Sequence, residues 1–300
     1  MSTAERMADY LGRDLVWALD PARFAAEALG MTPDPWQERV LRWIGQRLIL
    51  MCSRQSGKST TTSVLALHTA LYQPGSLVLL ISPSLRQSSE LFRKVTGHLA
   101  QLAETLGVRP PLDEENKLSL QLASGSRIVS LPSSEATIRG FSAVTLAIFD
   151  EDAFVSDDLY RAVRPMLAVS QGRLILMSTP FGKRGHFYHT WQGAIDGAAQ
   201  SEQSQEGIGD RWERVKVTAY DCPRISPAFL AEERASLGAL HFASEYLCEF
   251  VDNVNAVFSS ELVARAFTSE VAPLFGGGPD RADGLTGGAD AAAILPLFTR

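Results

Sequence analysis

The stretch Ser53-Arg54-Gln55-Ser56-Gly57-Lys58-Ser59-Thr60 decides the fold. An apolar run at residues 48–52 precedes it and predicts a buried strand, and the pattern over residues 58–72 predicts a helix. A Gly-Lys-Ser sequence between a strand and a helix is typical of a loop that binds nucleotide phosphates. The sequence therefore predicts a phosphate loop where a strand ends and a helix begins.

The chemistry of this loop follows from its residue types. Gly57 lets the backbone approach a phosphate, Lys58 brings a positive charge to the β- and γ-phosphates, and the Ser59 hydroxyl is a ligand for Mg²⁺. The general pattern has a further glycine at the position of Cys52, so the chain departs from it there. The expected ligands are thus ATP and Mg²⁺, with ATP-binding candidates at Ser53, Arg54, Gln55, Ser56, Gly57, Lys58, Ser59 and Thr60.

The apolar pattern of the chain predicts an α/β fold. Near-continuous apolar runs predict buried strands of a doubly wound, mainly parallel sheet with helices on both faces. We expect an exposed edge strand at residues 127–131, where apolar and polar residues alternate. The runs lie at residues 48–52, 77–81, 146–149 and 174–177, and the helical candidates at residues 58–72, 84–106 and 157–168.

Composition shifts predict five parts of the chain. Residues 194–210 are rich in Gly, Ser and Gln, which favours a flexible loop. After it we expect a short strand at 215–217 and a small helical subdomain. The expected parts are an N-terminal helical segment at 1–35, a P-loop ATPase core at 36–193, the loop at 194–210, a C-terminal subdomain at 211–255, and a linker with the start of a further domain at 256–300.

Overall composition excludes several classes of protein. The 300 residues are 45% hydrophobic and 21% charged, which is ordinary for a globular chain. The net charge of −6 argues against a permanently tight nucleic-acid binder, although a local basic patch remains compatible with transient binding. Cys52, Cys222 and Cys248 lack the spacing of a disulfide framework or zinc site. The chain shows neither a signal peptide nor an apolar run of about 20 residues, so we expect no membrane span.

A second candidate element is the apolar strand that ends at Asp150 and Glu151. We expect this strand beside the phosphate-loop strand, so that Asp150 reaches the Mg²⁺ ion. Glu151 is then placed to orient or deprotonate the attacking water. We expect the next carboxylate, Asp152, to be solvated.

Two further segments have alternative interpretations. Ser178 and Thr179 end another apolar strand, where they either sense the γ-phosphate as a coupling segment or simply lead into a turn. Gln37 follows Trp36 ahead of the first strand, and its amide can form two hydrogen bonds with adenine. A tryptophan in this position is also common in a core.

Taken together, these motifs resemble the ATPase domain of phage large terminase subunits. The loop sequence Arg-Gln-x-Gly-Lys-Ser without a leading glycine resembles the terminase variant, and the likeness covers roughly residues 33–260. The matching segments are Trp36-Gln37, Ser53 to Ser59, Ile148-Phe149-Asp150-Glu151, Ser178-Thr179-Pro180, Thr137-Ile138-Arg139-Gly140 and Glu245-Tyr246-Leu247-Cys248-Glu249-Phe250.

The resemblance implies a P-loop NTPase fold of the ASCE type and a role in viral DNA packaging. The chain would hydrolyse ATP and translocate double-stranded DNA into a bacteriophage or prophage procapsid. Its partners would be the portal protein and the terminase small subunit, with a homo-oligomeric ring on the portal. It would act in the host bacterial cytoplasm and transiently at the portal.

The same resemblance implies roles for individual residues. Lys58 and Ser59 would hold phosphate and Mg²⁺, Asp150 would be the metal-side carboxylate, and Glu151 the catalytic one. Arg54 would act on the γ-phosphate. Arg139 is either a finger that reaches a neighbouring subunit's nucleotide or one partner of a surface ion pair.

The chain also departs from the family. Large terminases usually continue into a nuclease domain, and Asp290 would match its first carboxylate, yet only ten residues follow it. We therefore expect no endonuclease activity from this chain, which would be a truncated gene, a prophage remnant, a frameshifted product or half of a split system. The competing functions are a helicase-like DNA-dependent ATPase and a non-hydrolysing remnant that keeps the fold. The candidate DNA contacts, or else plain solvated surface, are Arg161, Arg164, Lys183 and Arg184.

Overall fold

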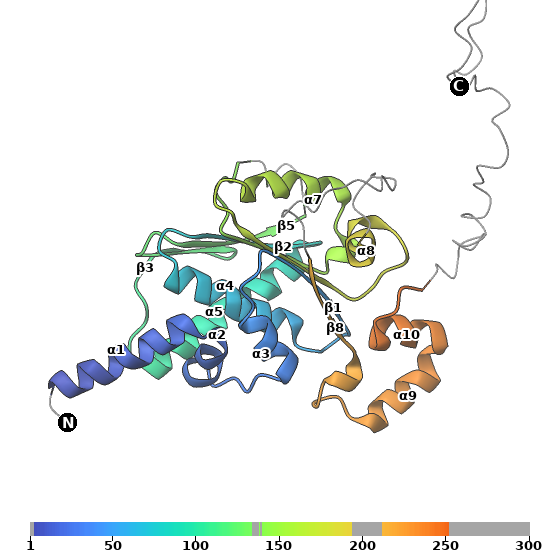
Figure 1. Cartoon of the computed structure of the whole chain (residues 1–300), viewed down its shortest axis with the longest axis horizontal. Helices are drawn as coiled ribbons and strands as arrows, with labels where there is room; N and C mark the ends of the chain where they lie inside the picture. Colours follow the sequence, from blue (N-terminus) through green and yellow to red (C-terminus); the bar gives the residue numbers. More distant parts are fainter. Residues whose placement is uncertain (1–2, 134–137, 139, 194–211, 252–300) are drawn as a thin grey trace, which may run out of the picture. The chain divides into compact units, whose positions relative to one another are not determined.

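The structure is a computed structural model that describes residues 3–133, 138, 140–193 and 212–251 (Figure 1). In these residues one eight-stranded sheet has the order β3-β4-β5-β2-β6-β7-β1-β8. Its strands are β1 (Arg47–Cys52), β2 (Leu77–Ser82), β3 (Leu112–Glu115), β4 (Ser119–Leu122), β5 (Arg127–Pro132), β6 (Leu146–Asp150), β7 (Arg173–Ser178) and β8 (Glu213–Val217).

The strands from β5 to β8 in this order run parallel, whereas β3 and β4 pair antiparallel. The predicted mainly parallel sheet is thus confirmed, but the expected neighbour of the phosphate-loop strand was wrong. Strand β7 lies between β1 and β6. The register places Met51 opposite Ser178, and Asp150 opposite Met177, so the ends of the three strands still lie close together.

The expectation of an exposed edge strand at residues 127–131 was also wrong. Strand β5 lies between β4 and β2, and Ile128 is fully buried. The β3–β4 hairpin, which the sequence analysis missed, forms this edge of the sheet. Strand β3 is short and acidic, and three of its four residues are exposed, so it lacks the apolar signal of a buried strand.

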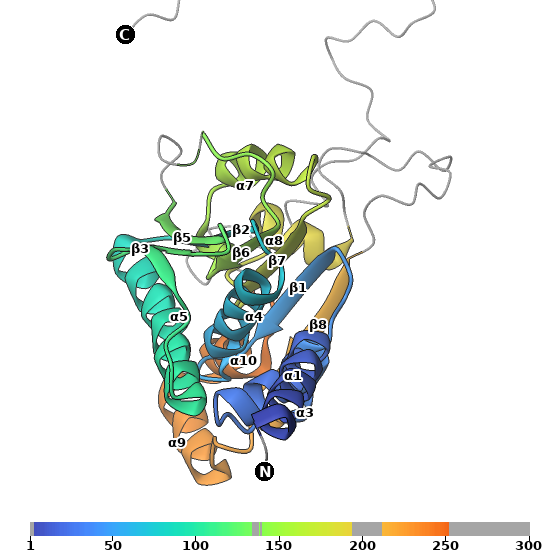
Figure 2. The ribbon, with the colours of Figure 1, turned by 90° about the vertical axis from the view of Figure 1, so that its left-hand side faces the viewer.

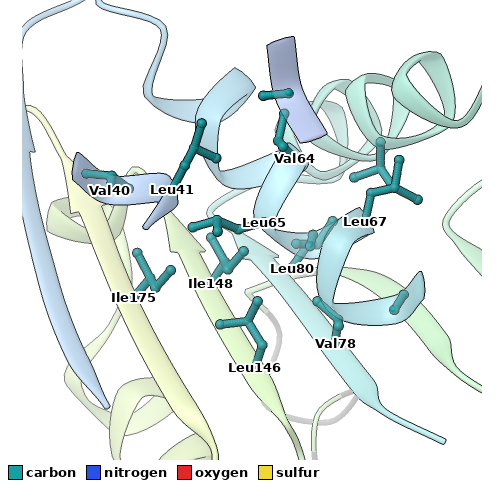
Figure 3. Packing of buried hydrophobic residues seen from close by; sticks show 14 of the residues in the cluster. Val40, Leu41, Val64, Leu65, Leu67, Val78, Leu80, Leu146, Ile148 and Ile175 are labelled. Carbon is teal, nitrogen blue, oxygen red and sulfur yellow. The ribbon is translucent and has the colours of Figure 1, made fainter. Parts of the chain in front are cut away.

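One face of the sheet is covered by α4 (Lys58–Tyr72) and α5 (Leu85–Leu106). Figure 3 shows Leu65 of α4 among Leu146, Ile148 and Ile175 from the central strands. The helical pattern predicted both helices because their apolar residues repeat at about 3.6 positions. The same core includes the N-terminal elements α1 (Thr3–Leu19), α2 (Pro21–Arg23), the π-helix η1 (Phe24–Ala28) and α3 (Pro35–Leu41).

The opposite face is covered by α7 (Asp157–Val163) and α8 (Gly185–Gln192), and Figure 2 shows α7 across the sheet from α4 and α5. The helix predicted over 157–168 changes at Arg164 into a 3-10 turn, η3 (Arg164–Leu167). Pro165 explains this change, because proline has no N–H to continue an α-helix. A short 3-10 turn, η2 (Asp152–Phe154), follows β6.

A small core packs around the last described elements. It consists of Ala219, Leu230, Phe242 and Tyr246 from η4 (Ala219–Asp221), α9 (Pro227–Leu237) and α10 (Ala239–Leu247). The strand expected at 215–217 is β8, which pairs with β1. The loop expected at 194–210, the segment 256–300 and Asp290 lie outside the described residues.

No helix among the described residues is long and apolar enough to span a membrane.

Candidate functional site

The phosphate loop curls tightly between β1 and α4. Gln55 and Gly57 have φ angles of 57° and 98°, and the Ser56 hydroxyl donates to the Ser53 carbonyl at 2.9 Å. A Cβ at position 57 would lie 2.8 Å from Nε2 of Gln37, so a larger residue cannot fit without a shift. Cys52, which stands where the general pattern has a glycine, is the last residue of β1 and fully buried. The chain makes its turn after this residue and needs no glycine there.

Lys58 begins α4 and points its ammonium at a carboxylate. Its Nζ lies 2.9 Å from Oε1 of Glu151, and only 9% of the lysine side chain is exposed. Burial alone would lower the pKa of Lys58, but the negative charges of Glu151 and Asp150 outweigh burial and raise it. The lysine therefore stays charged in this buried position.

Asp150 and Ser59 meet at the ends of β6 and the phosphate loop. Ser59 Oγ donates to Asp150 Oδ2 at 3.1 Å, although the two residues are 91 positions apart. The other oxygen, Oδ1, is buried without a hydrogen-bond partner among the described residues. Burial raises the pKa of Asp150 to about 6. A hydroxyl beside a carboxylate oxygen with a free lone pair fits Mg²⁺, which prefers oxygen ligands and keeps several waters.

Glu151 has a backbone conformation that is rare for a residue with a side chain. Its φ and ψ are 53° and 44°, in the left-handed region. Ser178 Oγ donates to Glu151 Oε2 at 3.4 Å, so the predicted coupling segment touches this carboxylate directly. Strained backbone of this kind clusters at functional sites, where the surrounding structure supports it.

Lys58 and Glu151 line a cavity of about 480 Å³. This volume is in the range of small-molecule sites. Its lining also includes Pro83, Gln87 and Phe154, which no local motif marks in the sequence, because only the fold brings them near the phosphate loop. The full lining consists of Arg54, Gln55, Lys58, Pro83, Gln87, Glu151, Phe154 and Thr179.

Both the oxygen and the nitrogen of the Gln37 side-chain amide form hydrogen bonds within the protein. Its Oε1 accepts from the backbone N–H of Asp34 at 2.8 Å, and its Nε2 donates to Thr61 Oγ1 at 2.9 Å. These bonds cap α3 and join it to α4, and the side chain is only 2% exposed. One amide hydrogen and one lone pair remain for adenine. The adjacent Trp36 packs partly buried against the core.

Arg54 joins the phosphate loop to α10. Its guanidinium pairs with the Glu245 carboxylate, and its backbone N–H donates to the Glu245 carbonyl at 3.2 Å. The neighbouring Ser244 donates to the carbonyl of Pro180, just after β7, at 3.1 Å. Helix α10 therefore contacts both the phosphate loop and the coupling segment, across 191 positions of sequence in the first case.

Asp152 was wrongly expected to be solvated. It is fully buried, and both of its carboxylate oxygens lie 2.9 Å from Nε2 of His186. Burial alone would lower the pKa of His186, but the charges and hydrogen bonds of Asp152 and Asp157 outweigh burial and raise it. A histidine in a helix carries no signal of such pairing in the sequence.

The remaining residues of interest are Arg139, Thr60 and the candidate DNA contacts. Arg139 lies outside the described residues. Thr60 is at the first turn of α4, where its hydroxyl accepts from Lys94 Nζ at 3.4 Å. The candidate DNA contacts all have local partners, since Arg161 pairs with Asp158 and Arg184 lies over the ring of Phe181, and both Arg164 and Lys183 have contacts of their own.

Comparisons with known proteins show which family the chain belongs to. A family model described as "Terminase large subunit, T4likevirus-type, N-terminal" matches residues 49–265, more than half of the chain. The chain belongs to the terminase large subunit family. The match covers the phosphate loop, the acidic strand end and the coupling segment.

Individual terminases extend this likeness. The large terminase subunit of Thermus virus P23-45 is 27% identical over an alignment of 259 residues, and the alignment covers 80% of this chain and 53% of that protein. The large terminase ATPase domain of Thermus phage P74-26 superposes with a TM-score of 0.64 at 25% identity, covering 78% of this chain and all of that domain. This chain spans about half the length of the large terminase subunit of Thermus virus P23-45.

A more distant terminase supports the fold. The large terminase of a thermophilic bacteriophage, solved in complex with ADP, has a TM-score of 0.56 at 14% identity and covers 73% of this chain. The predicted P-loop α/β fold with flanking helices is thus confirmed.

Proposed function

We propose that this chain is the ATPase part of a DNA-packaging motor, which couples ATP hydrolysis to the translocation of double-stranded DNA into a procapsid. The observation that carries the proposal is the contact of Lys58 with Glu151 in the lining of one cavity, together with the Ser59–Asp150 hydrogen bond formed by the residues next to them in the chain. Family membership and the likeness to a domain named as a terminase ATPase support it.

The proposed chemistry uses residues that line the cavity and their neighbours in the chain. Lys58 and the N–H groups of the loop bind the β- and γ-phosphates. Ser59 and Asp150 hold Mg²⁺, which neutralises phosphate charge when it is bound. Glu151 orients a water and accepts its proton as the water oxygen attacks the γ-phosphorus and ADP leaves. Arg54 lines the cavity and is placed to stabilise charge on the γ-phosphate.

Coupling to DNA movement is proposed to pass through Ser178 and α10. Ser178 bonds to the Glu151 carboxylate, and α10 holds both the phosphate loop and the segment after β7. A change at the γ-phosphate therefore reaches the last described helices through direct contacts. The proposed partners are double-stranded DNA, a portal protein and a terminase small subunit, with a ring of copies assembled on the portal.

The test is steady-state ATP hydrolysis by the purified chain with Mg²⁺, with and without double-stranded DNA. We expect turnover that Glu151→Ala abolishes and that the exposed-site control Glu104→Ala retains. Stimulation by double-stranded DNA supports packaging, whereas stimulation by single strands alone would favour a helicase. Binding of Mg-ATP without any turnover, in the presence of DNA and portal, would favour a non-hydrolysing remnant.

Arg139 is proposed to act on the nucleotide of a neighbouring copy in the ring. Mixing Arg139→Ala with Glu151→Ala tests this. In a mixed ring, the Glu151→Ala copy supplies Arg139 to a neighbouring Arg139→Ala copy, which still has Glu151. Recovery of hydrolysis in the mixture supports action between subunits. Full activity of Arg139→Ala alone, in the assembled motor, would leave the surface ion pair as its role.

A further inference from the structure

A carboxylate–imidazole cluster begins at Asp152, the residue that follows the proposed catalytic glutamate. It joins three elements, since Asp152 belongs to η2, Asp157 to α7 and His186 to the first turn of α8. His186 is 2% exposed and Asp152 is fully buried. Burying charged groups is costly, and apolar residues of similar size often hold a fold equally well. The cluster therefore calls for an explanation beyond stability.

The imidazole ring of His186 is held at both of its nitrogens and stacks on one neighbouring ring. Its Nε2 bonds to the Asp152 carboxylate at 2.9 Å, and its Nδ1 bonds to Asp157 Oδ1 at 2.9 Å. Asp157 Oδ1 also accepts from the backbone N–H of His186 at 2.8 Å. The ring of Tyr160 stacks on the imidazole with centroids 4.3 Å apart and an angle of 9°. The ring can therefore neither rotate nor shift without breaking several contacts.

Because His186 holds Asp152 in place, Asp152 also restrains Glu151, the residue before it. Glu151 is in the left-handed region, which is costly for a residue with a side chain and needs support from its surroundings. The turn after Glu151 is closed by two backbone hydrogen bonds, from Phe154 to Glu151 at 3.0 Å and from Val155 to Asp152 at 2.9 Å. The Asp152 carboxylate joins this turn to α8 through its hydrogen bond with His186.

We propose that His186 is a positioning residue for ATP hydrolysis, which fixes Asp152 and through it the adjacent Glu151 carboxylate. This inference rests on the proposed function of Glu151. Without the bond from His186 to Asp152, the turn relaxes and Glu151 leaves its place beside Lys58 and Ser178. Loss of groups that orient reactive residues typically costs about 10–100-fold in activity, and a misplacement of about 1 Å can cost about 10²-fold.

Two isosteric replacements separate this role from plain stabilisation. The amide nitrogen of glutamine in His186→Gln reaches the place of Nε2 and keeps a bond to Asp152. The amide nitrogen of asparagine in His186→Asn lies near the place of Nδ1 and keeps only Asp157. Both variants remove the imidazole charge and the stacked ring. Stability therefore falls in both variants, whereas only His186→Asn loses the contact with Asp152.

The experiment measures kcat, KM and the Kd for ATP for the wild-type chain and both variants, well below each Tm. We expect His186→Asn to lower kcat by about 10–100-fold, with KM for ATP unchanged or lower. We expect His186→Gln to keep kcat within a few fold. Asp157→Asn is the matched control, because it alters the outer partner and leaves the bond to Asp152, and its kcat should also stay within a few fold.

ATP affinity provides a readout that does not depend on turnover. If Glu151 moves away from Lys58 in His186→Asn, Lys58 is free for phosphate and ATP binds more tightly than in His186→Gln. Should His186→Asn fail to fold, Asp152→Ala removes the same contact and should show the same fall in kcat. Equal kcat and equal Kd for the two histidine variants would overturn the positioning role. A wild-type chain without turnover would overturn the proposed function, while the difference in Kd would still report the placement of Glu151.

Discussion

The ammonium of Lys58 lies 2.9 Å from the carboxylate of Glu151, so the residue proposed to bind phosphate and the residue proposed to activate water neutralise each other. The phosphates of ATP are expected to compete with Glu151 for Lys58. Binding of ATP would thereby release the carboxylate for the attacking water. The pair thus links phosphate binding to the availability of the general base.

This competition predicts opposite effects of Glu151→Gln on binding and on turnover. The neutral amide no longer holds Lys58, so ATP should bind more tightly than to the wild-type chain. Turnover should fall by at least about 10²-fold, because general base catalysis is lost. Titration with a fluorescent ATP analogue and steady-state hydrolysis measure the two effects. Weaker ATP binding by Glu151→Gln would contradict the competition.

A second prediction concerns the pair of Arg54 and Glu245. Arg54 lines the cavity while its guanidinium pairs with Glu245, so ATP and Glu245 should compete for it. Glu245→Gln should tighten ATP binding severalfold, and Arg54→Ala should weaken it. Because 64% of the Arg54 side chain is exposed, loss of the pair should cost less than about 1 kcal/mol of stability.

Glu249→Gln is the control for this pair, since Glu249 is an exposed carboxylate just beyond α10. It should leave both ATP affinity and Tm unchanged. An ATP affinity of Glu245→Gln equal to that of the Glu249→Gln control would show that Glu245 does not restrain Arg54.

A third prediction concerns Mg²⁺. Asp150 Oδ1 is buried and has no hydrogen-bond partner in the part of the chain that the structure describes, and Ser59 Oγ lies next to the other oxygen of the same carboxylate. The wild-type chain should therefore bind ATP more tightly with Mg²⁺ than with a chelator. Asp150→Asn should lose most of this difference while it still binds ATP through Lys58. If Mg²⁺ improved the ATP affinity of Asp150→Asn as much as that of the wild type, Mg²⁺ would be bound by residues other than Asp150.

The sequence predicted the strands of the sheet well but not their order. Residues 48–52 and 174–177 are almost wholly apolar because each strand is buried on both faces, and that signal is local. The position of β7 between β1 and β6 depends on contacts between distant segments, and a run of apolar residues does not encode its neighbours. The acidic strand β3 lacked even the local signal.

The site shows the same limit. Residues brought together by a local motif, such as Lys58 and Ser59, could be predicted from spacing alone. The pairing of Arg54 with Glu245 joins residues 191 positions apart, and His186 pairs with Asp152 across 34 positions. Both carboxylates look like ordinary surface residues in the sequence. Only the topology, which puts α10 and α8 beside the ends of β1 and β6, makes them partners.

A fourth prediction tests Gln37. The Ala variant removes both the acceptor for Asp34 and the donor to Thr61, so it should cost about 1–3 kcal/mol of stability. Glutamate at this position still accepts from Asp34 but cannot donate, so Gln37→Glu should retain the cap of α3 and lose the bond to α4. If the free amide hydrogen and lone pair of Gln37 also contact adenine, the Gln37→Ala variant should lose the preference for ATP over GTP that the wild-type chain shows. An unchanged preference would limit Gln37 to joining α3 and α4.

The last prediction is a pH dependence of stability from His186. The raised pKa of His186 means that the folded protein holds this proton more tightly than the unfolded chain, whose histidine pKa is about 6.5. The stabilisation is fully present below about pH 6.5 and is lost as the pH rises through the folded pKa. The groups that face the ring are Asp152, Asp157 and Tyr160, and Arg164 lies over the ring of Tyr160.

His186→Gln provides the reference for this effect, since glutamine does not titrate. The Tm of the wild-type chain should exceed that of His186→Gln most at about pH 6.5, and the difference should shrink steadily toward alkaline pH. The carboxylates favour the charged ring more than burial disfavours it, which fixes this sign. Measuring both Tm values at constant ionic strength from about pH 6.5 to about pH 9 covers the window above the unfolded pKa. A difference in Tm that grows with pH would mean that burial dominates and that the histidine is neutral in the folded protein.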